Sequence, residues 1–386
     1  MNFAKVINRK NTNSVKWDYF QEDLLPLWVA DMDFRSPKEV IKALDKRVKH
    51  GIFGYTFPQE SYYEAVINWM KKRHNWQIKK DWIIRTPGIV TALNMIVQVF
   101  TKENDSVLIQ RPVYTPFSEA IINNNRKLVN SPLILNNNHY EIDFDDFENK
   151  IINEKVKLFI MCSPHNPVGR VWTKDELIKM GNICLKHNVL MVVDEIHHDI
   201  VFKKYEHLPF ASLSEEFSLN CITCTAPSKT FNIAGLKISN IIIENEYLRK
   251  QFNDYLEKIS LQSSNLLALT ACEAAYNFGA KWLDELINYI YENKKFVVKF
   301  INDNLPMIKV IDSEATYLLW LDFRSLGMDN DKLSEFINKE AKLLLNNGYE
   351  YGEEGSGFLR LNIGCPRSIL EEALIRLDNA IKKHFH

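Results

Sequence analysis

Several short stretches of the chain are apolar at nearly every position rather than at alternate positions. They are Ser106–Gln110, Val156–Cys162, Val189–Ile196, Asn220–Thr225 and Ile238–Ile243. A strand with this pattern is expected to be buried on both faces, as in a parallel sheet that helices cover on each side. Helical stretches separate several of these strands. The strand–helix–strand order predicts an α/β, doubly wound domain.

The C-terminal third has a different pattern. A long amphipathic helix is expected over Ala280–Asn304, followed by strands at Thr316–Phe323 and Phe358–Ile363. This order predicts a smaller α+β domain. We expect a large domain over residues 48–285 and a small domain formed by residues 1–47 and 286–386.

Helix starts are marked by the S/T-x-x-E signature, in which a hydroxyl and a glutamate cap the first turn reciprocally. The signature begins at Ser36, Ser61, Thr173 and Ser368. We therefore expect a helix to begin at each of these four positions.

Composition and charge narrow the class of partner. The chain has 386 residues, 46% hydrophobic and 25% charged, with 48 basic and 49 acidic side chains. The net charge of −1 gives no electrostatic attraction to nucleic acid or to an anionic membrane. The expected partners are a small molecule and a second copy of the chain.

Apolar runs and cysteine content indicate the cellular compartment. No run reaches the about 18–20 apolar residues that a membrane helix needs, and the N-terminal residues lack the apolar core of a signal peptide. Six cysteines are too few for a disulfide framework. Cys221 and Cys224 form a C-x-x-C, but residues three apart in a strand face opposite ways, so we interpret them as ordinary strand cysteines. The expected location is the cytoplasm.

Polar side chains follow the predicted strands where the chain leaves the sheet, and Gly88 precedes a helix in the same way. Because open parallel sheets bind ligands at the carboxyl ends of their strands, these groups are expected to converge. They are Tyr114, Asn166, Asp194, His197, Ser228 and Lys229.

This set suggests one cofactor. A lysine amine can form a Schiff base with an aldehyde, an acid can hold a protonated ring nitrogen, and a helix N-terminus suits a phosphate. Pyridoxal 5′-phosphate carries all three groups. No single residue is specific for this cofactor, but the combination of residues and their order along the chain are.

Four motifs resemble those of fold-type I pyridoxal-phosphate enzymes, the aspartate aminotransferase superfamily. They are SPHNPVGRVW, VVDEIHHDI, APSKTFNIAGLK and FLRLNIGCPR. The resemblance implies an aspartate-aminotransferase-like large domain with a mostly parallel, seven-stranded sheet. Together with LWVADMDF and FGYTFP, the motifs are most similar to the MalY/PatB-like group of cystathionine β-lyases.

That resemblance implies a carbon–sulfur lyase. The expected reaction is α,β-elimination of L-cystathionine or a related cysteine S-conjugate to a thiol, pyruvate and ammonia. Two alternatives stay open: an aminotransferase of the same superfamily, and a regulatory binding protein on this scaffold. The preferred thiol leaving group does not follow from the sequence.

The resemblance also implies roles around the cofactor ring. Lys229 would hold the cofactor and then move the substrate α-proton. Asp194 would pair with the ring nitrogen, Asn166 would bond the ring oxygen O3′, and Tyr114 would stack on the ring. His197 stands where many aminotransferases have a tyrosine, which favours the lyase.

Further residues are implied for the phosphate. Ile89 and Val90 would offer backbone N–H groups, and Ser228 its hydroxyl. Lys237 stands where many members have an arginine. Tyr55 would reach the phosphate of a neighbouring subunit, which makes a homodimer the expected assembly.

For the substrate, the resemblance implies four residues. Arg360 would clamp the α-carboxylate, where a bidentate guanidinium fits. Tyr114 and Asn166 would also contact the substrate, and the loop with Ala30 would cover it. The alternative for Arg360 is an ordinary surface arginine, although alternation with Leu359 and Leu361 turns it to the other strand face.

The VVDEIHHDI motif also suggests a metal site at first sight. In a strand, however, Asp194 and Glu195 point to opposite faces. The sequence offers no further cysteine or histidine pair beside it to complete a ligand set. We expect no metal, and structural roles for Glu195, His198 and Asp199.

Overall fold

Seven strands form the central sheet of the computed structural model, which describes residues 2–20 and 23–385. Strand β10 is antiparallel to both of its neighbours, and the other pairs are parallel. The predicted α/β fold with a mostly parallel, seven-stranded sheet is confirmed. In spatial order the strands are β2 (Ile83–Thr86), β10 (Ser239–Ile242), β9 (Cys221–Thr225), β8 (Leu190–Asp194), β7 (Leu158–Cys162), β3 (Ser106–Ile109) and β4 (Lys127–Asn130).

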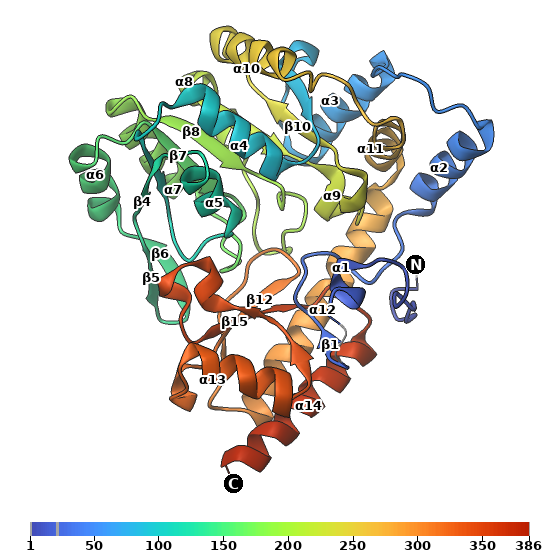
Figure 1. Cartoon of the computed structure of the whole chain (residues 1–386), viewed down its shortest axis with the longest axis vertical. Helices are drawn as coiled ribbons and strands as arrows, with labels where there is room; N and C mark the ends of the chain where they lie inside the picture. The colour runs from blue at the N-terminus through green and yellow to red at the C-terminus, as the bar shows by residue number, and fades with distance from the viewer. Residues whose placement is uncertain (1, 21–22, 386) are drawn as a thin grey trace.

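Helices cover both faces of this sheet, which explains why its strands lack alternation (Figure 1). In β7, Leu158 and Ile160 belong to one apolar cluster, and Phe159 and Met161 belong to the other. The first cluster includes α4 (Ile89–Phe100), α5 (Pro116–Ile122) and α10 (Glu246–Lys258). The second includes α3 (Glu60–His74), α6 (Phe144–Asn153), α7 (Lys174–Lys186) and α11 (Leu266–Phe278).

A second, antiparallel sheet lies in the lower part of the molecule as drawn in Figure 1. Its strands, in order, are β11 (Lys309–Val310), β12 (Leu318–Asp322), β15 (Phe358–Asn362) and β14 (Asn346–Asn347). Around it lie α12 (Ala280–Asn304), α13 (Asn330–Glu335) and α14 (Arg367–Phe385).

The N-terminal segment joins this lower part. Strand β1 (Leu25–Pro26) pairs in parallel with β13 (Leu343–Leu344). Helix α12 runs from the large sheet down to the second one (Figure 1). The division at residues 47/48 and 285/286 stays a prediction.

The remaining short elements connect these parts. They are α1 (Val15–Asp18), α2 (Lys38–His50), the hairpin β5 (Leu133–Asn136) and β6 (His139–Ile142), α8 (Glu215–Leu219) and α9 (Pro227–Thr230).

One of the four predicted helix starts is confirmed. Thr173 caps α7 and forms the full capping box with Glu176. The other three predictions are wrong by one or two residues, since the caps of α2 and α3 are Pro37 and Gln59, and α14 begins at Arg367. Ser36 donates its hydroxyl to the carbonyl of Asn232 instead.

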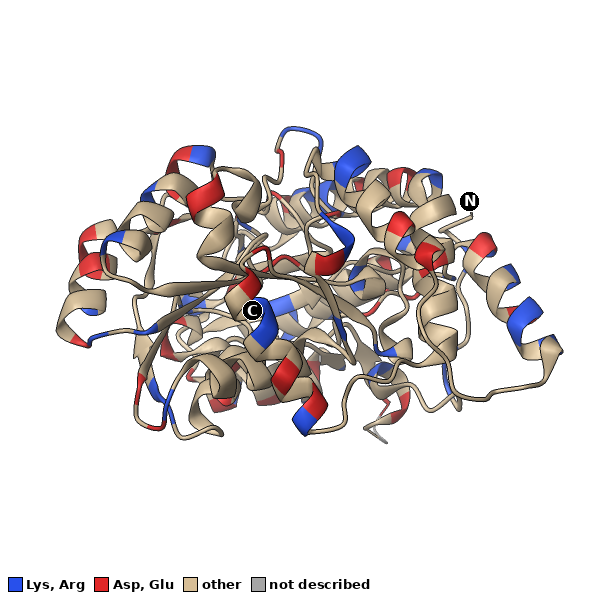
Figure 2. Cartoon of the chain, turned by 90° about the horizontal axis from the view of Figure 1, so that it is seen from above, with Lys and Arg blue, Asp and Glu red and all other residues tan. Residues whose placement is uncertain are grey.

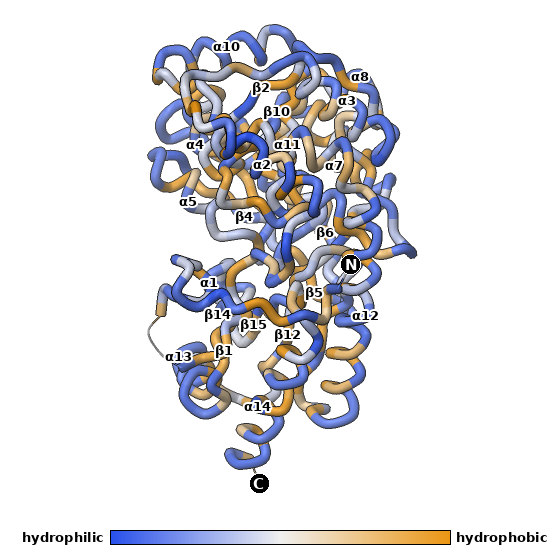
Figure 3. Tube along the Cα trace, turned by 90° about the vertical axis from the view of Figure 1, so that its right-hand side faces the viewer, coloured by the Kyte–Doolittle hydropathy of each residue, from blue (hydrophilic) through white to orange (hydrophobic). Residues whose placement is uncertain are grey.

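Charge and hydropathy follow this layering. Lys and Arg are interspersed with Asp and Glu over the visible helices (Figure 2), and the outer helix α10 is mainly hydrophilic (Figure 3). Among the described residues, no helix is both long and apolar enough to cross a membrane. Cys221 and Cys224 are buried free thiols in β9, as expected.

Candidate active site

The carboxyl ends of three neighbouring strands open into one cavity of about 150 Å³. Asp194 ends β8, in register with Cys162 at the end of β7 and Cys224 in β9. Asn166 follows β7, and Lys229 lies in α9 after β9. The parallel sheet therefore brings these polar side chains to the edge at which ligands bind.

Ten of the residues singled out from the sequence line this cavity. They are Ala30, Ile89, Val90, Tyr114, Asn166, Asp194, His197, Ser228, Lys229 and Lys237. Two others do not. Arg360 borders it through a hydrogen bond to Asn166, and Tyr55 is fully exposed on the segment between α2 and α3.

Lys229 is a buried amine held against the N-terminal loop. Its Nζ donates a hydrogen bond of 2.8 Å to the carbonyl of Ala30. Burial, with a smaller contribution from Arg360, lowers the pKa of Lys229 to about 8, although Asp31 and Asp194 act in the opposite direction. The neutral, nucleophilic form of the amine is therefore far more populated near physiological pH than in an ordinary lysine, although it is still the minor form.

Asp194 is a buried carboxyl group at the end of β8. Burial raises its pKa to about 7, against the hydrogen bond from the Ile196 N–H and the charge of Lys229. Among the described residues, it forms no ion pair with a lysine or arginine. A cation at this side of the cavity would restore its charged form.

The first turn of α4 supplies an anion site. Its N-cap is Gly88 at φ +112°, where a side chain would be strained, and the first N–H groups of a helix have no partner within it. Ile89 and Val90 lie in this turn, with Ser228 and Lys237 on the same cavity. The combination of N–H groups, a hydroxyl and an ammonium group suits a phosphate.

His197 is a neutral imidazole in the wall of the cavity. Burial, reinforced by the charges of Lys229 and Arg360, holds its pKa well below the usual range. Its Nδ1 is buried and lacks a hydrogen-bond partner. The ring of Tyr317 meets it edge-on, with centroids 6.1 Å apart.

Arg360 is 3% exposed, so the interpretation as a surface arginine is wrong. Its guanidinium donates to Oδ1 of Asn166 at 3.1 Å and to the carbonyl of Trp28 at 2.8 Å, while its Nε lacks a partner. Together with Asn346 Oδ1 at 2.5 Å, these acceptors are all neutral. A carboxylate would give this buried cation a charged partner.

The loop that contains Ala30 closes one side of the cavity. The hydroxyl of Tyr317 donates to the Ala30 carbonyl at 2.9 Å, and Asn362 donates to the carbonyls of Val29 and Asp31. The loop is thus fixed by Tyr317 and Asn362 from the region of the second sheet and by Lys229 from the region of the large sheet.

Sequence reasoning missed several residues at the site. Thr91 and Cys162 line the cavity, and Tyr317 contacts both Ala30 and His197. Thr91 could have been found, since it lies in the same first helical turn as Ile89. Tyr317 comes from the second sheet, and nothing in its local pattern indicates the contact.

Comparison with known proteins agrees with this geometry. Residues 22–377 match the family model for aminotransferases of class I and II. Cystathionine β-lyase PatB of Bacillus subtilis is 46% identical over 386 residues, covering 99% of this chain and all of the relative.

Solved structures of similar proteins cover the chain equally well. The crystal structure of cystalysin from Treponema denticola, described as containing a pyridoxal 5′-phosphate cofactor, has a TM-score of 0.96 and 43% identity, covering 99% of this chain and 98% of that one. The pyridoxal-phosphate-bound C–S lyase from Staphylococcus hominis has a TM-score of 0.93 and 35% identity, covering 98% of each chain. The chain therefore belongs to the class I and II aminotransferase family.

Proposed function

We propose that this protein is a pyridoxal-phosphate-dependent C–S β-lyase. It would cleave L-cystathionine or a related cysteine S-conjugate to a thiol, pyruvate and ammonia. One observation carries the proposal: a single cavity joins the amine of Lys229, whose pKa is lowered by burial, the carboxyl group of Asp194 and the N-terminus of α4. The cystathionine β-lyase and C–S lyase relatives support the choice of reaction.

The residues present fit the ring of the cofactor. Among the described residues, Asp194 forms no ion pair with a lysine or arginine, and a protonated ring nitrogen would provide a cationic partner. Asn166 and the unpartnered Nδ1 of His197 supply polar atoms to the same cavity. Tyr114 adds an aromatic face.

The residues also fit the phosphate. The helix N-terminus after Gly88 offers N–H groups from Ile89 and Val90, while Ser228 offers a hydroxyl. Lys237 lines the same cavity and would act as a point charge rather than as a bidentate fork.

The chain's own groups would divide the chemistry between them. Arg360 would bind the substrate α-carboxylate and orient the α-carbon, while the loop at Ala30 would exclude water. The amine of Lys229 would then take the α-proton. When bound, the cofactor supplies an electron sink for the resulting carbanion, from which the β-thiolate can depart.

An aminotransferase remains the alternative, because it begins with the same proton transfer. The position of His197 in the cavity wall supports the lyase only through the resemblance, so its role in the choice stays a prediction.

The assay that separates the two reactions supplies cystathionine without a keto acid. A lyase returns to its starting state after each elimination, so we expect pyruvate in many-fold molar excess over protein. Pyruvate is followed with lactate dehydrogenase. A transaminase would instead convert cystathionine to the corresponding keto acid without pyruvate, and would stop at one equivalent until a keto acid is added; that result would contradict the lyase.

We also propose a homodimer in the cytoplasm. Between α2 and α3, Ile52, Phe53, Tyr55 and Phe57 are all more than half exposed, which suits a protein interface. The six buried free cysteines suit a reducing compartment.

Sedimentation should give twice the chain mass, and Phe53→Ser with Phe57→Ser should lower the dimer fraction and the activity together. Ile134→Ser, at an exposed apolar position in β5, is the control. A wild-type monomer with full activity would overturn the dimer.

A further inference from the structure

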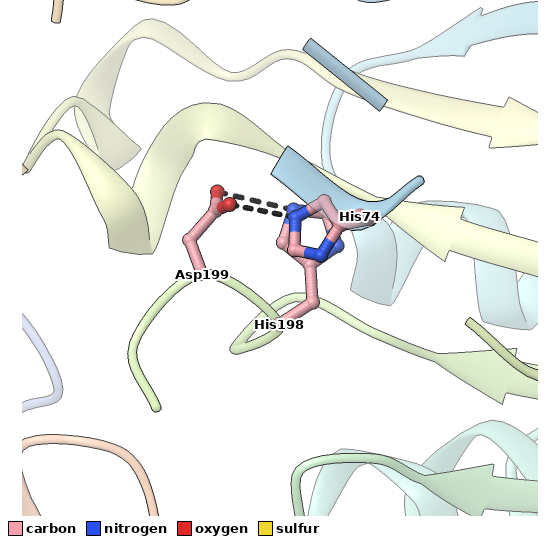
Figure 4. A group of neighbouring side chains, drawn as sticks. All are labelled: His74, His198 and Asp199. Carbon is pink, nitrogen blue, oxygen red and sulfur yellow. Dashed lines mark hydrogen bonds and ion pairs between the residues drawn. The ribbon is translucent and has the colours of Figure 1, made fainter. Parts of the chain in front are cut away.

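Five side chains of types that can bind metal ions lie close together at the turn that follows β8. They form the β8-turn cluster: His74, Glu195, His198, Asp199 and His207. Figure 4 shows His74 and His198 meeting the carboxylate of Asp199. No further cysteine or histidine pair was expected from the sequence to complete a ligand set beside VVDEIHHDI, but the fold brings His74 from α3 and His207 from a later loop to this turn.

Two triads within this cluster share His198. One is His74, His198 and Asp199, and the other is Glu195, His198 and His207. In each triad, the candidate ligand atoms lie within 4.8 Å of one another.

The first triad is already satisfied by hydrogen bonds. Asp199 accepts from Nε2 of His74 at 2.8 Å, from Oγ1 of Thr230 at 2.7 Å and from Nε1 of Trp69 at 3.1 Å. This carboxylate needs no ion to explain its burial.

The second triad is not satisfied. Oε2 of Glu195, Nε2 of His198 and Nε2 of His207 are all buried, and each lacks a hydrogen bond of acceptable geometry. The three residues are 1%, 2% and 6% exposed. Their nearest partners are ion-pair contacts, at 3.4 Å between Glu195 and His207 and at 3.1 Å between His198 and Asp199. Buried polar atoms without well-formed hydrogen bonds cost free energy, so three of them in one cluster require an explanation.

The carboxylates of the β8-turn cluster favour a bound cation. Glu195 and Asp199 are both buried, and among the described residues neither forms an ion pair with a lysine or arginine; their partners are histidines. The other oxygen of Glu195 accepts from the backbone N–H of Phe210 at 2.9 Å, which orients the free oxygen.

The spacing suits a zinc ion. Ligand atoms about 2.0–2.2 Å from a tetrahedral zinc ion lie roughly 3.3–3.6 Å from each other. Within the triad, Nε2 of His207 lies 3.4 Å from Oε2 of Glu195, which is inside this range. Two imidazoles and one carboxylate are a donor set that zinc binds in proteins.

We propose that Glu195, His198 and His207 bind a zinc-class divalent cation. The site is structural, because it lies among buried side chains rather than on the active-site cavity. It would fasten the turn that contains His197 and follows Asp194 to the loop ending at His207. The exposed residues 203–206 provide a route by which that loop can open and admit the ion.

The test is metal content of the holoenzyme. Wild-type protein is incubated with zinc, desalted and analysed by plasma mass spectrometry. We expect about one zinc ion per chain, and at least a tenfold loss of bound zinc in His198→Gln and in His207→Gln. His187→Gln is the matched control, because His187 also contacts a glutamate, at 2.8 Å from Glu148, but outside the cluster.

A second measurement does not depend on the variants folding. Wild-type protein loaded with Co²⁺ should show the visible absorption of a tetrahedral site, and zinc should abolish it. A chelator should lower the melting temperature of the wild type and of His187→Gln.

The proposal is overturned if folded wild-type protein retains no zinc and shows no cobalt absorption. It is equally overturned if His198→Gln and His207→Gln, folded by circular dichroism, bind as much zinc as His187→Gln.

Discussion

Lys229→Ala is expected to lower pyruvate release from L-cystathionine by at least roughly 10²–10⁴-fold, the range for loss of a positioned proton-transfer group. The variant also loses the amine that would hold the cofactor. After borohydride reduction, peptide mass spectrometry should find the cofactor on residue 229 of the wild type only. Lys229→Arg should be equally inactive, because a guanidinium stays protonated, whereas Lys204→Ala, at an exposed position, should match the wild type.

The pH dependence of the same amine provides an independent check. In cofactor-free protein the pKa of Lys229 is lowered to about 8, so its neutral fraction rises as the pH rises through 8. Acylation of Lys229 by a small reagent should therefore be half-maximal near pH 8. Exposed lysines have an ordinary pKa of about 10.4, so their acylation should become half-maximal only at a much higher pH. A half-point near 10 for Lys229, or full activity of Lys229→Ala, would contradict its assignment.

Asp194→Asn is expected to lower activity by roughly 10²–10⁴-fold, since loss of one partner of a buried charge pair costs about 3–5 kcal/mol. The amide is neutral and cannot keep a ring nitrogen protonated. Asp194→Glu retains the charge and should recover part of the activity.

Cofactor affinity should show the same requirement. Burial places the pKa of Asp194 near 7 in the cofactor-free protein, so below pH 7 the carboxyl group must release a proton before it can pair with the ring. Affinity in fluorescence titrations should therefore fall below pH 7 in the wild type, and less steeply in Asp194→Asn. Unchanged activity in Asp194→Asn would show that the ring nitrogen does not rely on this residue.

The large sheet could be predicted because burial on both faces leaves a direct signature. Strand β7 contributes Phe159 to one apolar cluster and Ile160 to the other, so neither face needs polar residues. The ends of the strands were less certain. The strand predicted through Ile196 ends at Asp194, because Oδ1 of Asp194 accepts from the Ile196 N–H and turns the chain.

The part of the candidate site that lies at the carboxyl ends of the parallel strands could be predicted from the sequence. Asn166, Asp194 and Lys229 converge because parallel strands present their carboxyl ends at one edge. Contacts between residues far apart in the chain leave no local pattern in the sequence. The hydrogen bonds from Lys229 and Tyr317 to the Ala30 carbonyl are therefore seen only in the folded structure.

The β8-turn cluster was missed for the same reason. His198 and Asp199 are adjacent to the predicted strand, but His74 lies at the end of α3 and His207 in a separate loop. Only the tertiary fold brings them together.

The most direct test of the proposed reaction is the molar ratio of ammonia to homocysteine released from L-cystathionine, measured with and without added keto acid. Elimination releases both products together, so the ratio should be about one in both conditions over many turnovers. A transaminase transfers the nitrogen to the keto acid. Negligible free ammonia, with turnover that depends on the keto acid, would contradict the lyase.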